Sequence, residues 1–386
     1  MKKLLLLISI FICLSISAND RKISFHHLNL EEGLPNVSVT DIWPDPSGII
    51  WIASTGGLDY FDGNSFTRVC PPLEIHPSST KLFVRQIVGD EAGQLYVLYT
   101  RHICVLNTNT GEFKTLYSGI CNCITYSNGL WIGHKNNLLY TSGPDAPIKT
   151  VYSISPDDGN ITAILRTANG DIWIGTSSGK VLFLKEGFSS PSEDVAAGKL
   201  HSQIYRIYED SKKTIWIGTL QDGVMSISKE GELTIYRHDI HNSKQISSNY
   251  VRDFCEDNLG NIWIGTYTGL DCLNTTTNKI TQHHSGMMRH DAISHSSVWA
   301  IKKDHQGTLW VGTYYGGINY FNPEYNIYNR YPVSNTEGEG LSAPITSKVL
   351  ADKHGDIWVA TEGGGLNHID RKTGKTTWYN TSSAPV

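Results

Sequence analysis

The chain has 386 residues, of which 18% are charged and 39% hydrophobic, and its formal net charge is −5. This length suits one large domain or two modest ones, and a mildly acidic chain without clustered Lys and Arg excludes a nucleic-acid-binding surface. The counts of 36 Gly, 10 Trp and 19 Tyr indicate many tight turns between aromatic-rich strands.

The first 20 residues have the pattern of a secretory signal. Lys2 and Lys3 form a basic start, and an apolar run from Leu4 to Ile16 is followed by small residues. This run is shorter than the roughly 20 residues that span a membrane, and nothing later in the chain approaches that length. We therefore predict that residues 1–18 are removed as a signal peptide and that the mature chain is exported to the periplasm.

From residue 22 onward, one sequence unit accounts for most of the chain. Residues 22–29 have the pattern of a single strand, and a unit of 35 to 48 residues then recurs. In the clearest units an alternating strand leads into an Asp-x-x-Gly turn, in which Asp accepts backbone hydrogen bonds and Gly takes a positive φ. The next strand carries an aromatic anchor, found at Trp51, Tyr96, Trp131, Trp173, Trp216, Trp263, Trp310 and Trp358.

Each unit is predicted to hold four short strands. After the anchor strand, a turn containing Gly leads to a third strand, and a more polar fourth strand closes the unit. Four antiparallel strands in this length are typical of a β-propeller blade, which buries its anchor against the next blade. The sequence therefore predicts an all-β propeller of four-stranded blades. The lone strand at residues 22–29 can complete the last blade and lock the ring.

Six cysteines remain once the signal peptide is removed. Export permits disulfides, but a domain with a large core does not depend on them, and the Cys-x-Cys pair is too closely spaced for a zinc knuckle. Small buried side chains on strands are the simpler interpretation, and the disulfide status stays open. The six are Cys70, Cys104, Cys121, Cys123, Cys255 and Cys272.

The start of the mature chain resembles a known family. The resemblance lies in Ile23-Ser-Phe-His-His-Leu, Glu32-Gly-Leu-Pro-Asn36, Asp45-Pro-Ser-Gly48-Ile-Ile-Trp51 and Gly57-Leu-Asp-Tyr-Phe-Asp-Gly63. These residues resemble the beginning of hybrid two-component sensors from polysaccharide-degrading gut bacteria, and the repeats resemble the propeller repeats of those sensors. The resemblance covers nearly all of residues 22–386.

The resemblance has consequences for domain organisation. In that family two seven-bladed propellers precede a β-sandwich, a membrane helix, a histidine kinase, a receiver and an AraC-type DNA-binding domain. It implies one seven-bladed propeller over residues 19–330 and the first blade of a truncated second propeller over residues 331–386. An eight-bladed ring remains an alternative, because eight repeats are present. We expect a sensor fragment without catalytic residues or cofactors, whose full-length relatives are anchored in the inner membrane and signal as homodimers.

Ligand contacts are expected on one face of the ring. The turn after the anchor strand and the link into the next unit lie on the same face, around the mouth of the central channel. Most repeats carry small Thr and Gly in this turn, whereas Arg101, His102, His134 and Lys135 occupy it in the second and third repeats. Either these basic side chains form a functional patch that favours an acidic sugar, or the two repeats have drifted.

Aromatic and polar side chains occupy the same loops further along the chain. Aromatic faces stack on sugar rings, and amides and carboxylates bond to hydroxyl groups, so an oligosaccharide is a chemically suitable ligand. The aromatic residues could equally be packing residues that line the channel. The candidates are Gln221, Asp222, Tyr267, Trp299, Tyr314 and Tyr315.

The leading prediction is a periplasmic sensing module that binds an oligosaccharide from glycan breakdown. A first alternative is an exported lyase or glycosidase, for which Glu362 and Asp222 are the obvious carboxylates on the channel face. A second is a protein-interaction propeller. No metal site is predicted, because the His- and Met-rich group falls on an exposed outer strand and the loop after it, at His283, His284, Met287, Met288 and His290.

Overall fold

The computed structural model of the protein describes residues 23–72, 83–187, 193–242, 245–286, 291–325, 331 and 333–381. Within these residues the chain is built from β-strands, with one short 3-10 turn at Pro156–Asp158 (η1). The all-β class is therefore confirmed. The predicted signal peptide, residues 1–18, lies outside the described residues. No helix in the described part of the chain combines the length and the apolar character needed to cross a membrane.

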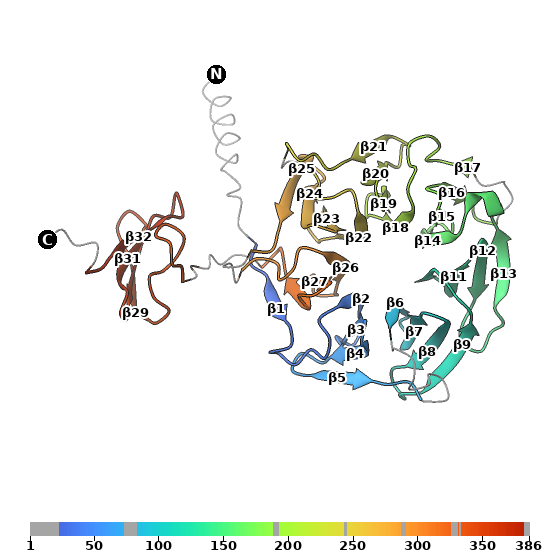
Figure 1. The fold of residues 1–386 in the computed structure, drawn as a ribbon, viewed down its shortest axis with the longest axis horizontal. Coiled ribbons are helices and arrows are strands. Elements are labelled where there is room, and N and C mark those ends of the chain that lie inside the picture. The colour runs from blue at the N-terminus through green and yellow to red at the C-terminus, as the bar shows by residue number, and fades with distance from the viewer. Residues whose placement is uncertain are drawn as a thin grey trace, which may run out of the picture. The chain divides into compact units, whose positions relative to one another are not determined.

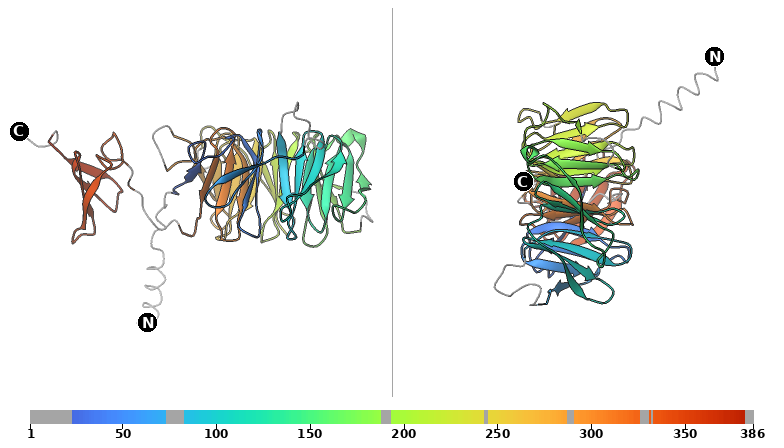
Figure 2. Two further views of the ribbon diagram at one scale, coloured as in Figure 1. Left: turned by 90° about the horizontal axis from the view of Figure 1, so that it is seen from below. Right: turned by 90° about the vertical axis from the view of Figure 1, so that its right-hand side faces the viewer.

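The four-stranded antiparallel sheets of the first seven repeats follow one another around a ring, and the first strand of each of these repeats lies at the inner edge (Figures 1 and 2). In six of these sheets the chain order runs from the inner to the outer edge. Their strands are β2 (Val39–Pro44), β3 (Ile50–Ser54), β4 (Gly57–Phe61) and β5 (Phe66–Val69); β6 (Val84–Gly89), β7 (Gln94–Tyr99), β8 (His102–Asn107) and β9 (Phe113–Ser118); β10 (Cys123–Tyr126), β11 (Leu130–His134), β12 (Asn137–Thr141) and β13 (Lys149–Ser153); β14 (Ile161–Arg166), β15 (Ile172–Thr176), β16 (Val181–Leu184) and β17 (Glu193–Asp194); β18 (Ile204–Glu209), β19 (Ile215–Thr219), β20 (Val224–Ile227) and β21 (Leu233–Tyr236); β22 (Val251–Glu256), β23 (Asn261–Thr266), β24 (Leu270–Asn274) and β25 (Lys279–His283).

The sheet of the seventh repeat takes its outer strand from the start of the mature chain. Strand β1 (His26–Leu28) pairs antiparallel with β28 (Ile318–Phe321), which is followed inward by β27 (Leu309–Thr313) and β26 (Val298–Lys303). This pairing confirms that the lone strand completes a blade. It joins the two ends of the ring, because the chain continues from β1 directly into the first repeat.

The eighth repeat also forms a four-stranded sheet. Its strands are β29 (Thr346–Ala351), β30 (Ile357–Thr361), β31 (Gly365–Ile369) and β32 (Thr376–Tyr379). The described residues from Phe25 to Glu324 form one compact unit, and those from Tyr325 onward belong to a second. The predicted boundary at residue 330 lies outside the described residues, and the assignment of the eighth sheet to a second propeller stays a prediction.

The repeat motif Asp-x-x-Gly-x-x-Trp is a hydrogen-bonded unit. In the sixth repeat Asp257 Oδ1 accepts the N–H groups of Leu259 and Asn261, each at 2.9 Å, and Asp257 Oδ2 accepts the indole N–H of Trp263 at 2.8 Å. The turn ends at Gly260, whose φ of +77° other residues avoid. One carboxylate thus caps the turn and orients the anchor. The same indole bond joins Asp45 to Trp51, Asp210 to Trp216, Asp304 to Trp310 and Asp352 to Trp358.

The anchors pack between neighbouring sheets, as predicted. Trp263 is only 1% exposed, and its ring centroid lies 4.8 Å from that of Phe321 on the next sheet. Trp216 likewise faces Phe254 of the following sheet at 6.5 Å. Of the other tryptophan anchors, Trp51, Trp131 and Trp310 are buried, whereas Trp173 and Trp358 are half-buried.

The links into the inner strands are tied to the third strand of the same sheet. Ser247, which precedes β22, donates its backbone N–H to Asp271 at 2.7 Å, and its hydroxyl also bonds to this carboxylate. Asn319 holds Ser294 at the equivalent position: its Oδ1 accepts Ser294 N–H at 2.7 Å, and its Nδ2 donates to Ser294 Oγ at 2.8 Å. Asp271 differs from Asn319 in that burial raises its pKa to about 6, an effect that the Ser247 hydrogen bonds only partly oppose.

We expect Trp263→Ala to destabilise the ring by about 3–5 kcal/mol, because it leaves a cavity between two sheets and removes the indole hydrogen bond to Asp257. Urea unfolding monitored by circular dichroism would measure this. Trp358→Ala is the matched control: Trp358 is half-buried in the second compact unit, so the main transition should not move. An unchanged transition in Trp263→Ala would contradict the inter-sheet role.

Asp271→Asn should stabilise the protein at neutral pH and not near pH 4. The folded pKa is about 6 against an ordinary 3.8, so the favourable protonated state is lost as pH rises through this window. Above it, the ionised carboxyl costs up to about 3 kcal/mol. Asn319 shows that an amide keeps both bonds. Thermal melts at pH 4 and pH 7.5 test this, and equal gains at both would contradict it.

Candidate functional site

The inner strands share a β-bulge at their first residues. The pairing register shifts by one residue in six of the seven inner strands, as between Val251 and Asp253, so that one extra residue is left outside the ladder. Bulges re-aim side chains, and here the extra residues all line a central cavity of about 390 Å³. These residues are Thr40, Arg85, Thr162, Tyr205, Arg252 and Trp299.

Most bulge side chains bind the backbone of the next sheet. Thr40 Oγ1 donates to Val84 O at 2.7 Å, and Thr162 Oγ1 donates to Ile204 O at 2.7 Å. Arg85 and Arg252 make equivalent bonds, and Asn122 does so in the third sheet. This contact ties each blade to its neighbour at the channel, which gives the position a structural role.

Two bulge residues break this rule, and both are aromatic. Tyr205 packs edge-on against Tyr250, with ring centroids 5.5 Å apart. The indole N–H of Trp299 is buried and has no hydrogen-bond partner in the described part of the chain. Since these two side chains do not close the ring as the others do, they are the first candidates for a binding role.

Tyr205 and Trp299 flank an arginine held between aromatic rings. The guanidinium carbon of Arg252 lies 4.4 Å from the ring centre of Tyr250, 4.7 Å from that of Trp299 and 5.3 Å from that of Tyr267. Such cation–π contacts fix the charge in place. We call Tyr250, Arg252, Tyr267, Trp299 and Tyr314 the Arg252 cluster.

The rings of this cluster present flat faces at the ends of the inner strands. Trp299 and Tyr314 are parallel within 8°, with centroids 5.8 Å apart, and Tyr250 and Tyr267 are parallel within 9° at 5.9 Å. Tyr314 also contacts Tyr315 at 4.2 Å. Tyr267 and Tyr315 are 54% and 60% exposed, whereas Arg252 is 6% exposed. The cluster therefore combines exposed aromatic surface with a buried, oriented charge.

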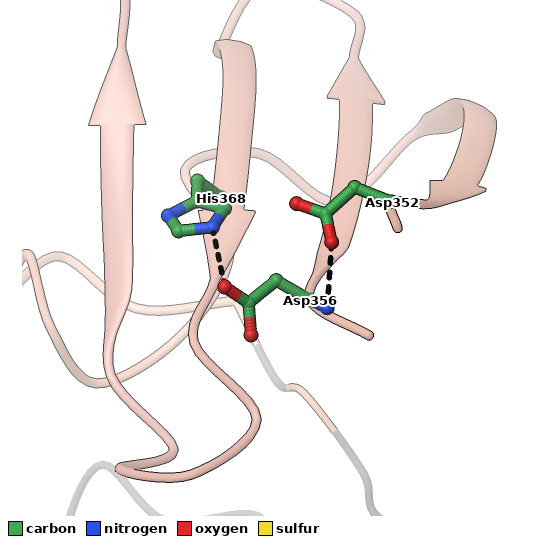
Figure 3. A group of neighbouring side chains, drawn as sticks. All are labelled: Asp352, Asp356 and His368. Carbon is green, nitrogen blue, oxygen red and sulfur yellow. Dashed lines mark hydrogen bonds and ion pairs between the residues drawn. The ribbon is translucent and has the colours of Figure 1, made fainter. Parts of the chain in front are cut away.

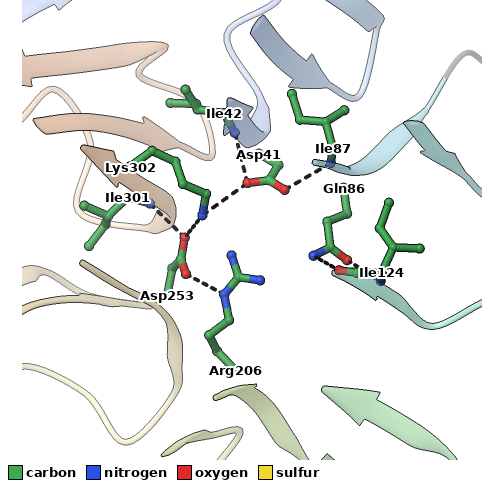
Figure 4. Close-up of polar contacts among 9 residues, drawn as sticks. All are labelled: Asp41, Ile42, Gln86, Ile87, Ile124, Arg206, Asp253, Ile301 and Lys302. Atoms are coloured by element: carbon green, nitrogen blue, oxygen red, sulfur yellow. Dashed lines mark hydrogen bonds and ion pairs between the residues drawn. The ribbon is translucent and has the colours of Figure 1, made fainter. Parts of the chain in front are cut away.

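A network of charges lies deeper along the inner strands (Figure 4). Asp253 accepts Arg206 Nε at 2.5 Å and Lys302 Nζ at 2.6 Å, and Lys302 also lies 3.5 Å from Asp41. Burial alone would raise the pKa of Asp253, but the two cations outweigh it and lower the pKa to about 2. The network joins four inner strands, and Gln86 adds a reciprocal pair of bonds to the backbone of Ile124.

Four of the residues predicted from the sequence come together at this site: Trp299, Tyr267 and Tyr314 lie in the Arg252 cluster, and Tyr315 contacts it. Of all the predicted site residues, only Trp299 is among those that line the cavity itself. Gln221 is exposed. Asp222 accepts the N–H groups of His201 and Ser202, and these bonds outweigh burial and lower its pKa.

The basic residues of the second and third repeats lie apart from the Arg252 cluster. The ring of His102 stacks on Tyr99 at 4.8 Å, and His134 Nδ1 lies 2.9 Å from Ile120 O. Arg101 and Lys135 are exposed, and none of the four lines the cavity. These four residues therefore do not belong to the Arg252 cluster, and their role in ligand binding stays a prediction.

Sequence reasoning missed Arg85, Tyr205, Tyr250 and Arg252. All but Tyr250 occupy the bulge position, one residue after the first β-branched residue of an inner strand. A comparison of the repeats at that single position would have found them, because Thr recurs there and any large side chain departs from the pattern. Tyr250 precedes the strand and is brought to Tyr205 only by the ring.

Groups that could hold a metal are engaged in packing or turns. His283 packs its ring against Trp263 at 5.5 Å, and residues 287–290 lie outside the described residues. In the eighth sheet Asp352, Asp356 and His368 approach one another, with His368 Nε2 3.3 Å from Asp356 Oδ2 (Figure 3). Asp352 is the turn residue of its repeat and caps that turn, as its equivalents do elsewhere.

The cysteines follow the simpler interpretation. All six are free thiols in the structure, and four of them are buried. Burial raises the pKa of Cys104, Cys123 and Cys255 to about 12 and that of Cys121 to about 11. These four thiols are buried packing groups.

Comparisons with known proteins agree with the repeat pattern. The family model described as two component regulator propeller matches residues 150–178, 198–221, 245–268 and 292–315. A search of curated proteins found no match. Among solved structures, the extracellular domain of a putative hybrid two component system from B. thetaiotaomicron is similar with a TM-score of 0.72 and 22% identity. A second such domain from the same organism has a TM-score of 0.65 and 18% identity.

The alignments cover nearly all of this chain but only about half of each of these two solved chains. Each alignment includes 93% of this chain but only 49% and 53% of the two solved chains, so this chain spans about half their length. A catalytically inactive virginiamycin B lyase from Staphylococcus aureus is also similar, with a TM-score of 0.60, 14% identity and coverage of 77% of this chain and 98% of its own. At these identities the structural likeness shows the propeller fold. The predicted resemblance is thus confirmed: the chain carries two-component regulator propeller repeats.

Proposed function

We propose that this chain is the ligand-sensing part of a periplasmic two-component signalling protein, and that it binds an oligosaccharide at the mouth of the central cavity. The Arg252 cluster carries the proposal. It places exposed aromatic faces beside a fixed charge, over a cavity of about 390 Å³, within the range of about 300–1,000 Å³ typical of small-molecule sites. The matched repeats support the signalling context.

The chemistry of the cavity suits a sugar. The exposed rings of Tyr267, Tyr314 and Tyr315 offer apolar surface to the C–H face of a pyranose. The amide side chains of Asn122, Asn160 and Gln203 line the same cavity and can bond to hydroxyl groups in either direction. Ion pairs tie four inner strands together beside the cavity, so we expect the site to be preformed.

Binding is favoured over hydrolysis by the state of the carboxylates. A glycosidase needs two carboxyl groups about 5–10 Å apart that remain available to the substrate. Asp41 accepts backbone N–H groups and faces Lys302, and Asp253 is held by two cations. Asp222 caps the link before β18, and Glu362 belongs to the other compact unit.

Signalling would follow from the position of the site. Tyr205, Arg252 and Trp299 belong to three consecutive sheets, so one bound ligand would bridge them. A change in their packing could then be passed to the remainder of a longer sensor. In the full protein we expect this readout to act through a homodimer and a kinase, as in the family that the sequence resembles.

Calorimetry against plant and host oligosaccharides tests the proposal. We expect one sugar class to bind, and Trp299→Ala to weaken that binding roughly tenfold or more, because truncating an anchoring aromatic costs about 2 kcal/mol. Lys135→Ala, which changes an exposed residue outside the cavity, is the control and should bind normally. Turnover of a bound sugar, or binding that needs Lys135 and not Trp299, would contradict the proposal.

A further inference from the structure

The central cavity has the opposite charge to the chain. The whole protein carries a formal net charge of −5, yet Arg85, Arg206 and Arg252 line the cavity against a single carboxylate, Asp41. Low-dielectric walls concentrate such a local field. The cavity is therefore a positive site within an acidic protein.

The carboxylates near the cavity already form ion pairs with Arg206 and Lys302. Arg206 and Lys302 both bond to Asp253, and Lys302 also faces Asp41 at 3.5 Å. Arg85 and Arg252 form no ion pair in the described part of the chain. Two guanidinium groups thus remain without a counter-ion inside the ring.

Arg252 is the better defined of the two. It is 6% exposed, and among the described residues only its Nη1 has hydrogen-bond partners, Ser297 Oγ at 2.8 Å and Val298 O at 3.2 Å. Its Nε is buried without a hydrogen-bond partner among the described residues. The rings of Tyr250 and Trp299 fix the plane of the guanidinium, as a bidentate contact to an anion requires.

Arg85 adds a second positive charge to the same cavity. Its Nη1 donates to Cys121 O at 2.8 Å and its Nη2 donates to Asn122 O at 3.3 Å. Neutral carbonyls orient this side chain without cancelling its charge. A buried charge without a counter-ion is costly, and an anionic ligand would offset that cost.

From these contacts we infer that the ligand is an anionic sugar, whose carboxylate or sulfate group binds Arg252 and is attracted by Arg85. This inference rests on the proposed function and narrows its ligand class. It also assigns the acidic group to the cavity, whereas the sequence linked an acidic sugar to the exposed loops with Arg101, His134 and Lys135.

The test compares two disaccharides that differ only at C6, digalacturonate and its neutral galactose counterpart, by calorimetry with the full chain. A sulfated galactose disaccharide distinguishes sulfate from carboxylate. We expect an acidic sugar to bind about tenfold to hundredfold more tightly than the neutral one, as for a charge-assisted hydrogen bond. Arg252→Gln should abolish this preference, and Lys135→Gln, which removes an exposed cation outside the cavity, should keep it.

Arg85→Gln provides a second variant in case Arg252→Gln does not fold, and it should reduce the same preference. Equal binding of acidic and neutral sugars would overturn the inference and leave the sugar-sensing proposal intact. If no sugar binds, thermal melts with sodium sulfate and malonate test the anion site by itself. Stabilisation that depends on Arg252 would support the anion site and count against a sugar ligand. No stabilisation would overturn both the anion site and the sugar-sensing proposal.

Discussion

The ring depends on one repeated interaction, the packing of the aromatic anchor of a blade, usually tryptophan, against the next blade. A four-stranded blade has apolar side chains on both faces and cannot bury both by itself, so it is stable only between neighbours. The Asp257–Trp263 bond, repeated in three other units of the ring, orients the indole that fills the space between blades. In the second compact unit, by contrast, Val349 and Leu350 on β29 are 62% and 63% exposed.

Ring closure also determines what the inner strands can do. Each must pair within its own sheet, bond to the next blade and leave room at the centre. The bulge meets these demands with one residue per repeat, and Thr40 and Thr162 show its structural form. Tyr205 and Trp299 occupy the same position but, among the described residues, do not make this bond to the backbone of the next blade. The site therefore arises where the repeat departs from its own pattern, over three consecutive blades that keep the scaffold intact.

The fold could be predicted from the sequence because its signals are local. The Asp turn and the anchor lie six residues apart, and the unmatched strand at residues 22–29 indicated the closure that β1 and β28 make. The site could be predicted only in part. Trp299 and the tyrosines at 267, 314 and 315 stood out as large residues in small-residue loops. Tyr250 and Arg252 could not be recognised as site residues from the sequence, because their contacts with Tyr205 and Trp299 of neighbouring repeats form only in the closed ring.

A crystal structure of the chain with a bound acidic disaccharide would show whether the central cavity is the binding site. We expect a sugar ring against Trp299, with its carboxylate or sulfate oxygens within hydrogen-bonding distance of Arg252. A sugar bound at the loops of Arg101 and Lys135, with the central cavity free of ligand, would contradict this expectation.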